Sequence, residues 1–172
     1  MQVHDVAIVG FGPVGAVLAN ILGKAGLRVA VIERMAGIYD KPRAINIDHE
    51  VMRVLQTVGL ADAVDAICIP HTGTEFLGID NRLIKLFEPP QRPYPLGWTQ
   101  NLMFIQPEFE PILREGAARF ANVEIFLSHE VLSLTQDGSG VSLQVKAPAE
   151  GSEWTVCARY AVACDGAASP SR

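Results

Sequence analysis

The chain has 172 residues, of which 49% are hydrophobic and 19% are charged, and this composition excludes a disordered segment and favours a globular fold of ordinary size. The net charge is −5 and the sequence has no basic stripe, so we expect neither a nucleic-acid partner nor an anionic membrane partner. The apolar runs are too short for a membrane span and the first residues lack the basic leader of a signal peptide, so we expect a cytoplasmic protein.

The first predicted element is a buried parallel strand over residues 6–9, followed by a glycine-rich turn and a helix that runs to about Lys24. Gly10, Gly12 and Gly15 have the spacing G-x-G-x-x-G. In this motif the first glycine permits a sharp turn, the second lets a pyrophosphate approach the backbone, and the third lets the helix lie close to the sheet. The first N–H groups of the helix then face the phosphates, at the positive end of the helix dipole.

A second buried strand is predicted over residues 29–32, after Gly26 ends the helix as its C-cap, and this strand leads into Glu33. Glu33 lies 18 residues beyond Gly15, close to the spacing of about 20 for a carboxylate that accepts hydrogen bonds from a ribose. The alternative is a plain strand–helix–strand unit with an incidental surface glutamate. The strand–helix context, the spacing and the acid together favour a dinucleotide site.

A loop over residues 35–47 is predicted to lead into a helix with Asp48 as its N-cap and Gly59 at its end. Residues 71–87 have a β-type pattern with a turn at Asp80-Asn81. Four prolines between residues 88 and 97 exclude regular structure there.

Several aromatic, histidine and cysteine side chains have a purely structural interpretation as well as a functional one. Trp98 and Phe104 either line a ligand pocket or belong to the core. We expect the histidines His49, His71 and His129 to be solvated or to lie at strand ends. The cysteines Cys68, Cys157 and Cys164 are widely spaced and form no metal-ligand pair, so we expect free buried thiols.

The last third of the chain is predicted to begin with a helix over residues 108–120, which tolerates Pro111 only in its first turn. Strands follow over residues 123–127, 131–135, 141–145 and 154–164. The last of these runs into Asp165-Gly166, a common turn pair. Its position after an apolar strand, at the carboxyl edge where such folds bind ligands, favours a ligand-binding role for Asp165.

Together these motifs resemble the class A flavoprotein monooxygenases, the aromatic hydroxylases. The resemblance rests on segments spread over the whole chain: Gly10-Phe-Gly-Pro-Val-Gly15 with Glu33-Arg34, Pro42-Arg43-Ala44, Gln106-Pro107, and Cys164-Asp165-Gly166 continuing to Arg172. Within the family, Ile38-Tyr39 and the segment 48–56 are most similar to the 3-(3-hydroxyphenyl)propionate hydroxylases.

The resemblance implies an α/β fold, namely a Rossmann-like FAD-binding fold that is incomplete, with the start of a β-rich substrate-binding domain. Residues 1–70 would form the FAD-binding βαβ core and residues 71–105 a partial β insertion of the substrate domain. Residues 106–172 would continue the FAD-binding domain, which is truncated because family members run to several hundred residues.

The resemblance also implies a set of FAD contacts, without a metal site and without a catalytic residue that can be named. The set comprises Gly10, Gly12, Pro13, Gly15, Glu33, Arg34, Arg43, Gln106, Val131 and Asp165. Glu33 would bind the adenosine ribose, and Arg34 the adenosine half or a phosphate of the nicotinamide cofactor. Arg43 would lie near the pyrophosphate, unless it is an ordinary loop cation. Gln106 would contact the flavin or its ribityl chain, Val131 the adenine through its backbone, and Asp165 the pyrophosphate or the ribityl hydroxyls.

The implied reaction uses NADH or NADPH to reduce the flavin and dioxygen to hydroxylate a phenolic acid such as 3-(3-hydroxyphenyl)propionate. This fragment alone would be inactive, and a homo-oligomer is left open. The alternatives are another FAD-dependent oxidoreductase and a catalytically silent nucleotide-binding fragment. A C-x-x-x-x-C pair is absent from the sequence, which argues against the disulfide reductases.

Overall fold

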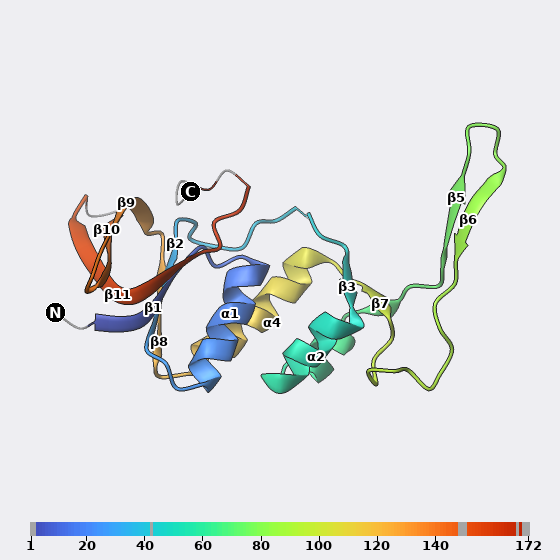
Figure 1. Cartoon of the computed structure of the whole chain (residues 1–172), viewed down its shortest axis with the longest axis horizontal. Helices are drawn as coiled ribbons and strands as arrows, with labels where there is room; N and C mark the ends of the chain where they lie inside the picture. Colours follow the sequence, from blue (N-terminus) through green and yellow to red (C-terminus); the bar gives the residue numbers. More distant parts are fainter. Residues whose placement is uncertain (1–2, 42, 148–150, 168, 170–172) are drawn as a thin grey trace. The chain divides into compact units, whose positions relative to one another are not determined.

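The computed structural model describes residues 3–41, 43–147, 151–167 and 169 of the chain. Its contacts divide the chain into two units: unit 1 comprises residues 1–40 and 110–172, and unit 2 comprises residues 41–109 (Figure 1). The predicted functional division at residues 70 and 105 remains a prediction.

Unit 1 is built on a mixed sheet with the strand order β8-β2-β1-β11-β10-β9. The parallel part consists of β8 (Val123–Leu127), β2 (Val29–Glu33), β1 (Val3–Val9) and β11 (Glu153–Ala163). The strands β10 (Gly140–Lys146) and β9 (Glu130–Asp137) continue from β11 as an antiparallel meander. The predicted α/β fold is therefore confirmed, and each strand predicted for this sheet is present with bounds that differ by at most three residues.

Both faces of β2, and of β1 from Val6 to Val9, are buried, which explains their unbroken apolar runs. One face, with Val9 and Ile32, packs against the meander side chains Leu143 and Val145. Figure 1 shows helix α1 (Pro13–Lys24) and the unit 1 part of helix α4 (Gln106–Ala118) on the opposite side of β1 and β2. The buried side chain of Asn20 joins these two helices, because its Nδ2 donates to the carbonyl oxygen of Leu113 at 2.8 Å.

The ends of α1 follow from its sequence. Pro13 occupies the first helical turn, where a missing N–H costs nothing. At the other end the C-cap is Ala25 and not Gly26, which was predicted as the cap. Gly26 follows with φ of 80°, and the N–H of Leu27 donates to the carbonyl of Leu22, as in a Schellman motif.

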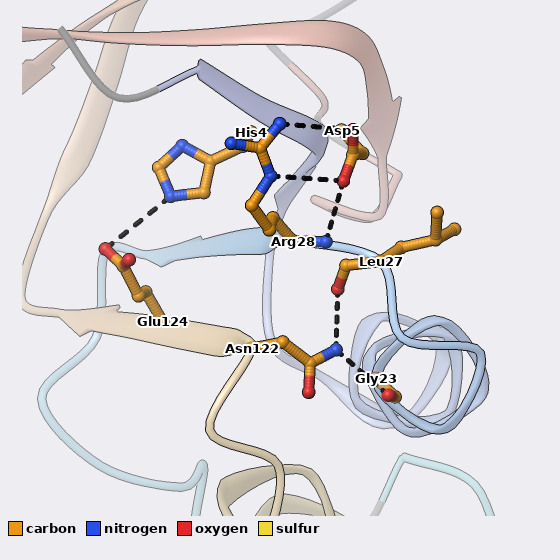
Figure 2. Close-up of polar contacts among 7 residues, drawn as sticks. All are labelled: His4, Asp5, Gly23, Leu27, Arg28, Asn122 and Glu124. Carbon is orange, nitrogen blue, oxygen red and sulfur yellow. Dashed lines mark hydrogen bonds and ion pairs between the residues drawn. The ribbon is translucent and has the colours of Figure 1, made fainter.

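Polar contacts hold the amino ends of the parallel strands together (Figure 2). Asn122, just before β8, donates to the carbonyl oxygens of Gly23 and Leu27 at 2.9 and 2.7 Å. At the start of β1, Asp5 accepts the backbone N–H of Arg28 at 2.9 Å and lies 3.4 Å from its guanidinium. The N–H of Arg28, and then its guanidinium, lower the pKa of Asp5 below its usual value. These contacts fix the edge of the sheet opposite the carboxyl ends of β1 and β2.

Unit 2 contains a small antiparallel sheet of β3 (Asn46–Asp48), β7 (Asn101–Met103) and β4 (Ile69–Pro70), and a hairpin of β5 (Thr74–Leu77) and β6 (Leu83–Phe87). Its helices are α2 (His49–Thr57) and α3 (Ala61–Asp65). Asp48 caps α2 as predicted, since its side chain accepts the N–H of Val51 at 2.9 Å. The elements β3, β4, β7 and α3 were not predicted, because two to five residues are too few to display a period.

Two aromatic residues of unit 2 have structural roles. The side chain of Phe104 is 6% exposed and its ring packs against Phe109 at 4.7 Å, so it belongs to the core. The indole N–H of Trp98 donates to the side chain of Gln56 at 3.0 Å. Neither side chain lines the pockets described below.

Helix α4 corrects one prediction. It begins at Gln106, two residues before the predicted start, and therefore Pro111 lies inside the helix and not in its first turn. Proline inside a helix removes one N–H donor and weakens the helix locally. Among the described residues, no helix is both long enough and apolar enough to cross a bilayer.

Candidate functional site

The carboxyl ends of β1, β2 and β11 meet at one edge of the unit 1 sheet. Val9 is paired in parallel register with Ile32 on one side and with Ala163 on the other. The residues that follow these positions, Gly10, Glu33 and Cys164, therefore emerge side by side. This is the edge at which open α/β sheets bind their ligands.

The three glycines of the motif have different surroundings. Gly10 has a φ of 100°, and a Cβ there would lie 2.5 Å from the carbonyl oxygen of Cys164. A Cβ on Gly15 would overlap the carbonyl oxygen of Gly10. At Gly12, in contrast, a Cβ would meet no atom of the described residues within 4 Å. Packing alone thus requires two of the glycines, while the third borders open space.

That open space lies at the start of α1. Gly12 is the N-cap, no side chain of the described residues caps the helix, and the first turn carries no acidic residue. Pro13 removes one of the N–H groups that would need a partner. An anion placed there would accept the remaining N–H groups at the positive end of the helix dipole.

Glu33 holds the chain on both sides of this turn. Its side chain is buried, and its two carboxylate oxygens accept the N–H of Phe11 at 2.7 Å and the N–H of Met35 at 2.8 Å. A carboxylate has about four lone-pair positions, so it retains acceptor capacity for a hydroxyl group. The side chain therefore lies beside the glycine-rich turn. Its contact with a ribose remains a prediction.

Asp165 lines an open pocket of about 280 Å³, together with Val14, Ala163, Cys164, Gly166 and Ser169. The hydroxyl of Ser169 is buried and has no hydrogen-bond partner among the described residues. Burial, and then the carboxylate of Asp165, raise the pKa of the Cys164 thiol, which disfavours the reactive thiolate form. An unsatisfied hydroxyl in such a pocket fits a polar ligand.

Arg34 and Val131 are the remaining predicted residues of unit 1. Arg34 is exposed directly after Glu33. Val131 is half-buried in β9, opposite Val145. The chain that enters β9 is held near the end of β2, because the N–H of His129 donates to the backbone carbonyl of Glu33 at 2.9 Å. The predicted contacts of Arg34 and Val131 with FAD remain predictions.

Unit 2 brings Arg43 and Gln106 together. Gln106 is 2% exposed, and its Oε1 accepts the backbone N–H groups of Arg43 at 3.1 Å and Ala44 at 2.9 Å. Gln106 thus holds the loop that carries Arg43, whose side chain is exposed. Pro42, which belongs to the same motif, lies outside the described residues.

A second open pocket, of about 360 Å³, lies within unit 2. One face of the β5–β6 hairpin forms part of its wall, with Phe76 opposite Lys85, and strand residues such as Asn101 form another part. His71 was predicted to be solvated or to lie at a strand end, and it directly follows β4. It is half-buried in this wall, with Nε2 3.0 Å from the hydroxyl of Thr74.

Two features of the site were missed in the sequence. Ser169 stands in the Asp-Gly motif but received no role, because only its burial identifies it. Phe11 also received no role from the sequence, yet its side chain is only 2% exposed. A large apolar residue inside a glycine motif was the available signal.

The sequence of this chain is similar to those of known FAD-binding proteins. The model of the FAD-binding domain family matches residues 3–172. The 3-(3-hydroxy-phenyl)propionate/3-hydroxycinnamic acid hydroxylase of Comamonas testosteroni is 44% identical over 94% of this chain and 27% of its own length. The hydroxylase of the same name from Klebsiella pneumoniae is 41% identical over 96% of this chain and 29% of its own.

Solved structures show the same fold. The p-nitrophenol 4-monooxygenase PnpA of Pseudomonas putida DLL-E4 is 27% identical with a TM-score of 0.83, and the match covers 97% of this chain and 42% of PnpA. The anhydrotetracycline hydroxylase OxyS of Streptomyces rimosus is 28% identical with a TM-score of 0.81, over 98% of this chain and 32% of OxyS. The chain thus spans less than a third of the length of the curated relatives described above.

Proposed function

The chain belongs to the FAD-binding domain family, as the N-terminal FAD-binding part of a class A flavin monooxygenase, and from this we infer that it binds FAD at the carboxyl edge of the unit 1 sheet. The observation that carries this proposal is the open space at Gly12, beside a helix start without a side-chain cap and a buried Glu33 carboxylate. A diphosphate fits the first feature and a ribose the second.

The remaining residues take roles around these two anchors. Gly10, Pro13 and Gly15 shape the turn and the helix start, and Glu33 binds the ribose while it holds Phe11. Asp165 binds the pyrophosphate or the ribityl hydroxyls.

The other contacts are those that the family resemblance implies at each position. Arg34, and Val131 through its backbone, contact the adenosine half of FAD. The alternative for Arg34 is a contact with a phosphate of the nicotinamide cofactor. Arg43 binds the pyrophosphate of FAD. Gln106 holds the loop that carries Arg43, and it contacts the flavin or its ribityl chain.

The proposed reaction is the NADH- or NADPH-dependent hydroxylation of a phenolic aromatic acid with dioxygen. FAD, when bound, supplies the electron transfer and the activation of dioxygen, while the protein binds and orients it and excludes water. The curated relatives are named for 3-(3-hydroxyphenyl)propionate and 3-hydroxycinnamic acid, which makes an acid of this class the first substrate to test.

A second candidate is a nucleotide-binding fragment without catalysis of its own. The observation that favours it is the coverage, since this chain spans only 27–29% of those relatives. Both candidates require FAD binding, and they differ in whether hydroxylation follows when the remaining segment is supplied.

Two experiments test the proposal in turn. Titration of the purified chain with FAD, followed by flavin fluorescence, should give saturable binding, and the absence of binding would contradict both candidates. In a chimera, this chain replaces the matching segment of the Comamonas testosteroni hydroxylase. A chimera that binds FAD and oxidises NADH or NADPH faster when 3-(3-hydroxyphenyl)propionate is added supports the hydroxylase. A folded chimera that binds FAD without such stimulation contradicts it.

A further inference from the structure

Phe11 occupies the centre of the glycine-rich turn. It stands between Gly10, which makes the bend, and Gly12, which borders the open space. Its N–H is held by the carboxylate of Glu33 at 2.7 Å, and its ring is 2% exposed. A displacement of Phe11 would therefore move the backbone on both sides of it.

A cation on α4 lies over this ring. The guanidinium carbon of Arg114 is 5.0 Å from the centre of the Phe11 ring, and the side chain of Arg114 is 13% exposed. Its Nη2 lies 3.4 Å from the carboxylate of Glu110, one helical turn earlier, whose side chain is 2% exposed. The face of an aromatic ring attracts a cation, and more strongly where water is excluded.

This buried pair is a poor candidate for a purely stabilising contact. Burying two opposite charges costs desolvation energy that their attraction repays only when their hydrogen-bonding groups are satisfied. The Nε of Arg114 is buried and has no hydrogen-bond partner among the described residues. The contact that distinguishes Arg114 is therefore the one with the Phe11 ring.

We propose that Arg114 is a positioning residue for the glycine-rich turn: anchored by Glu110, its guanidinium holds the Phe11 ring and so fixes the backbone from Gly10 to Gly12 in the form that accepts the pyrophosphate of FAD. This inference rests on the FAD site proposed above. Glu33 fixes the turn by accepting the backbone N–H of Phe11, and Arg114 fixes it by contacting the side chain of Phe11.

The test is a double-mutant cycle on FAD binding by the full chain. Arg114→Lys keeps a positive charge near Glu110 but removes the planar group that stacks on a ring. Phe11→Leu keeps an apolar side chain but removes the ring. Each variant should raise the Kd for FAD by about 3- to 30-fold. The double variant should bind no more than about twofold more weakly than the weaker single variant, because both changes remove the same contact.

A matched control separates this role from general packing. Arg119 lies with its guanidinium carbon 5.4 Å from the ring centre of Phe120, just beyond the end of α4. Arg119→Lys makes the same chemical change to another arginine–phenylalanine pair and should leave the Kd for FAD unchanged. The visible circular dichroism of the bound flavin should change in Arg114→Lys and not in Arg119→Lys.

Urea unfolding of each variant without FAD completes the test. Two outcomes would show that Arg114 is only a core residue. In the first, Arg114→Lys and Phe11→Leu lower the free energy of unfolding but leave the Kd for FAD within about twofold of wild type. In the second, the effects of the two changes on Kd multiply in the double variant. Either outcome contradicts the proposal and leaves the FAD site standing. If the wild-type chain binds no FAD, the proposed function fails and this inference fails with it.

Discussion

Replacement of Gly12 by valine should remove FAD binding and leave the fold intact. Gly12 has φ of −69° and ψ of −173°, an extended conformation that valine adopts readily, and its Cβ would enter open space. Valine is a poorer N-cap residue than glycine, which lowers the free energy of unfolding. It also reduces the conformational entropy of the unfolded chain, which raises the free energy of unfolding. We therefore expect the free energy of unfolding to change by no more than about 1 kcal/mol.

The effect on binding follows from what occupies that space. The valine methyl groups would stand where the pyrophosphate approaches the backbone, and they would keep its oxygens away from the N–H groups at the start of α1. A hydrogen bond to a charged group contributes about 1.5–3 kcal/mol, so the loss of two such bonds weakens FAD binding by roughly 100-fold or more.

Two further variants calibrate the measurement. Gly138, in the turn between β9 and β10, also has open space at its Cβ position, so Gly138→Val should leave both folding and FAD binding unchanged. Gly10→Ala should instead lower the free energy of unfolding by about 2–5 kcal/mol, because it combines a positive φ with a close contact to Cys164.

The assay pairs an equilibrium FAD titration, followed by flavin fluorescence, with urea unfolding followed by circular dichroism. The reasoning is refuted if Gly12→Val is folded and binds FAD as tightly as wild type. Loss of both folding and binding in Gly12→Val would also refute it, because the structure leaves room for this side chain.

Three other expectations can be measured on the same chain. Glu33→Gln keeps one acceptor oxygen where the carboxylate had two, so it should lower the free energy of unfolding by about 1–3 kcal/mol and also weaken FAD binding. If urea unfolding and FAD titration gave the same values for the variant and the wild type, the role of Glu33 in holding Phe11 and Met35 would be contradicted. Gln106→Leu leaves the N–H of Ala44 without its acceptor, so hydrogen exchange at that amide should accelerate, and unchanged protection would contradict the contact. Because Arg28 lowers the pKa of Asp5 in the folded state, Asp5 stabilises the fold above its unfolded pKa of about 3.9 and loses this effect as the pH falls through its lowered value. The stability difference between wild type and Asp5→Asn in urea should therefore be present at neutral pH and vanish in acid, and a difference that persisted at low pH would contradict this assignment.

The parallel half of unit 1 could be predicted from sequence because each of its elements has a local signal. The strand ending at Val9, the glycine turn, the helix from Pro13 and the strand ending at Glu33 follow one another within a short stretch. Their order alone places Glu33 beside the turn, since parallel strands end at the same edge.

Contacts between distant segments could not be predicted in this way. Nothing in the local pattern pairs Phe11 with Arg114, or Gln106 with the backbone of Ala44. The start of α4 was misplaced for a related reason. Pro111 is a strong helix-start signal by itself, but the helix around it begins earlier and contains it.

The central position of β1 has a consequence for synthesis of the protein. One neighbour of β1, the strand β2, follows within two dozen residues, but Val9 pairs on its other side with Ala163, which lies 154 positions later. At about 5–20 residues per second, a ribosome needs roughly 8–30 seconds to make that stretch. During this interval one edge of β1 lacks its final partner, so a new copy is exposed to wrong pairing until β11 emerges. A chaperone bound to this edge during the interval should therefore raise the yield of correctly folded protein.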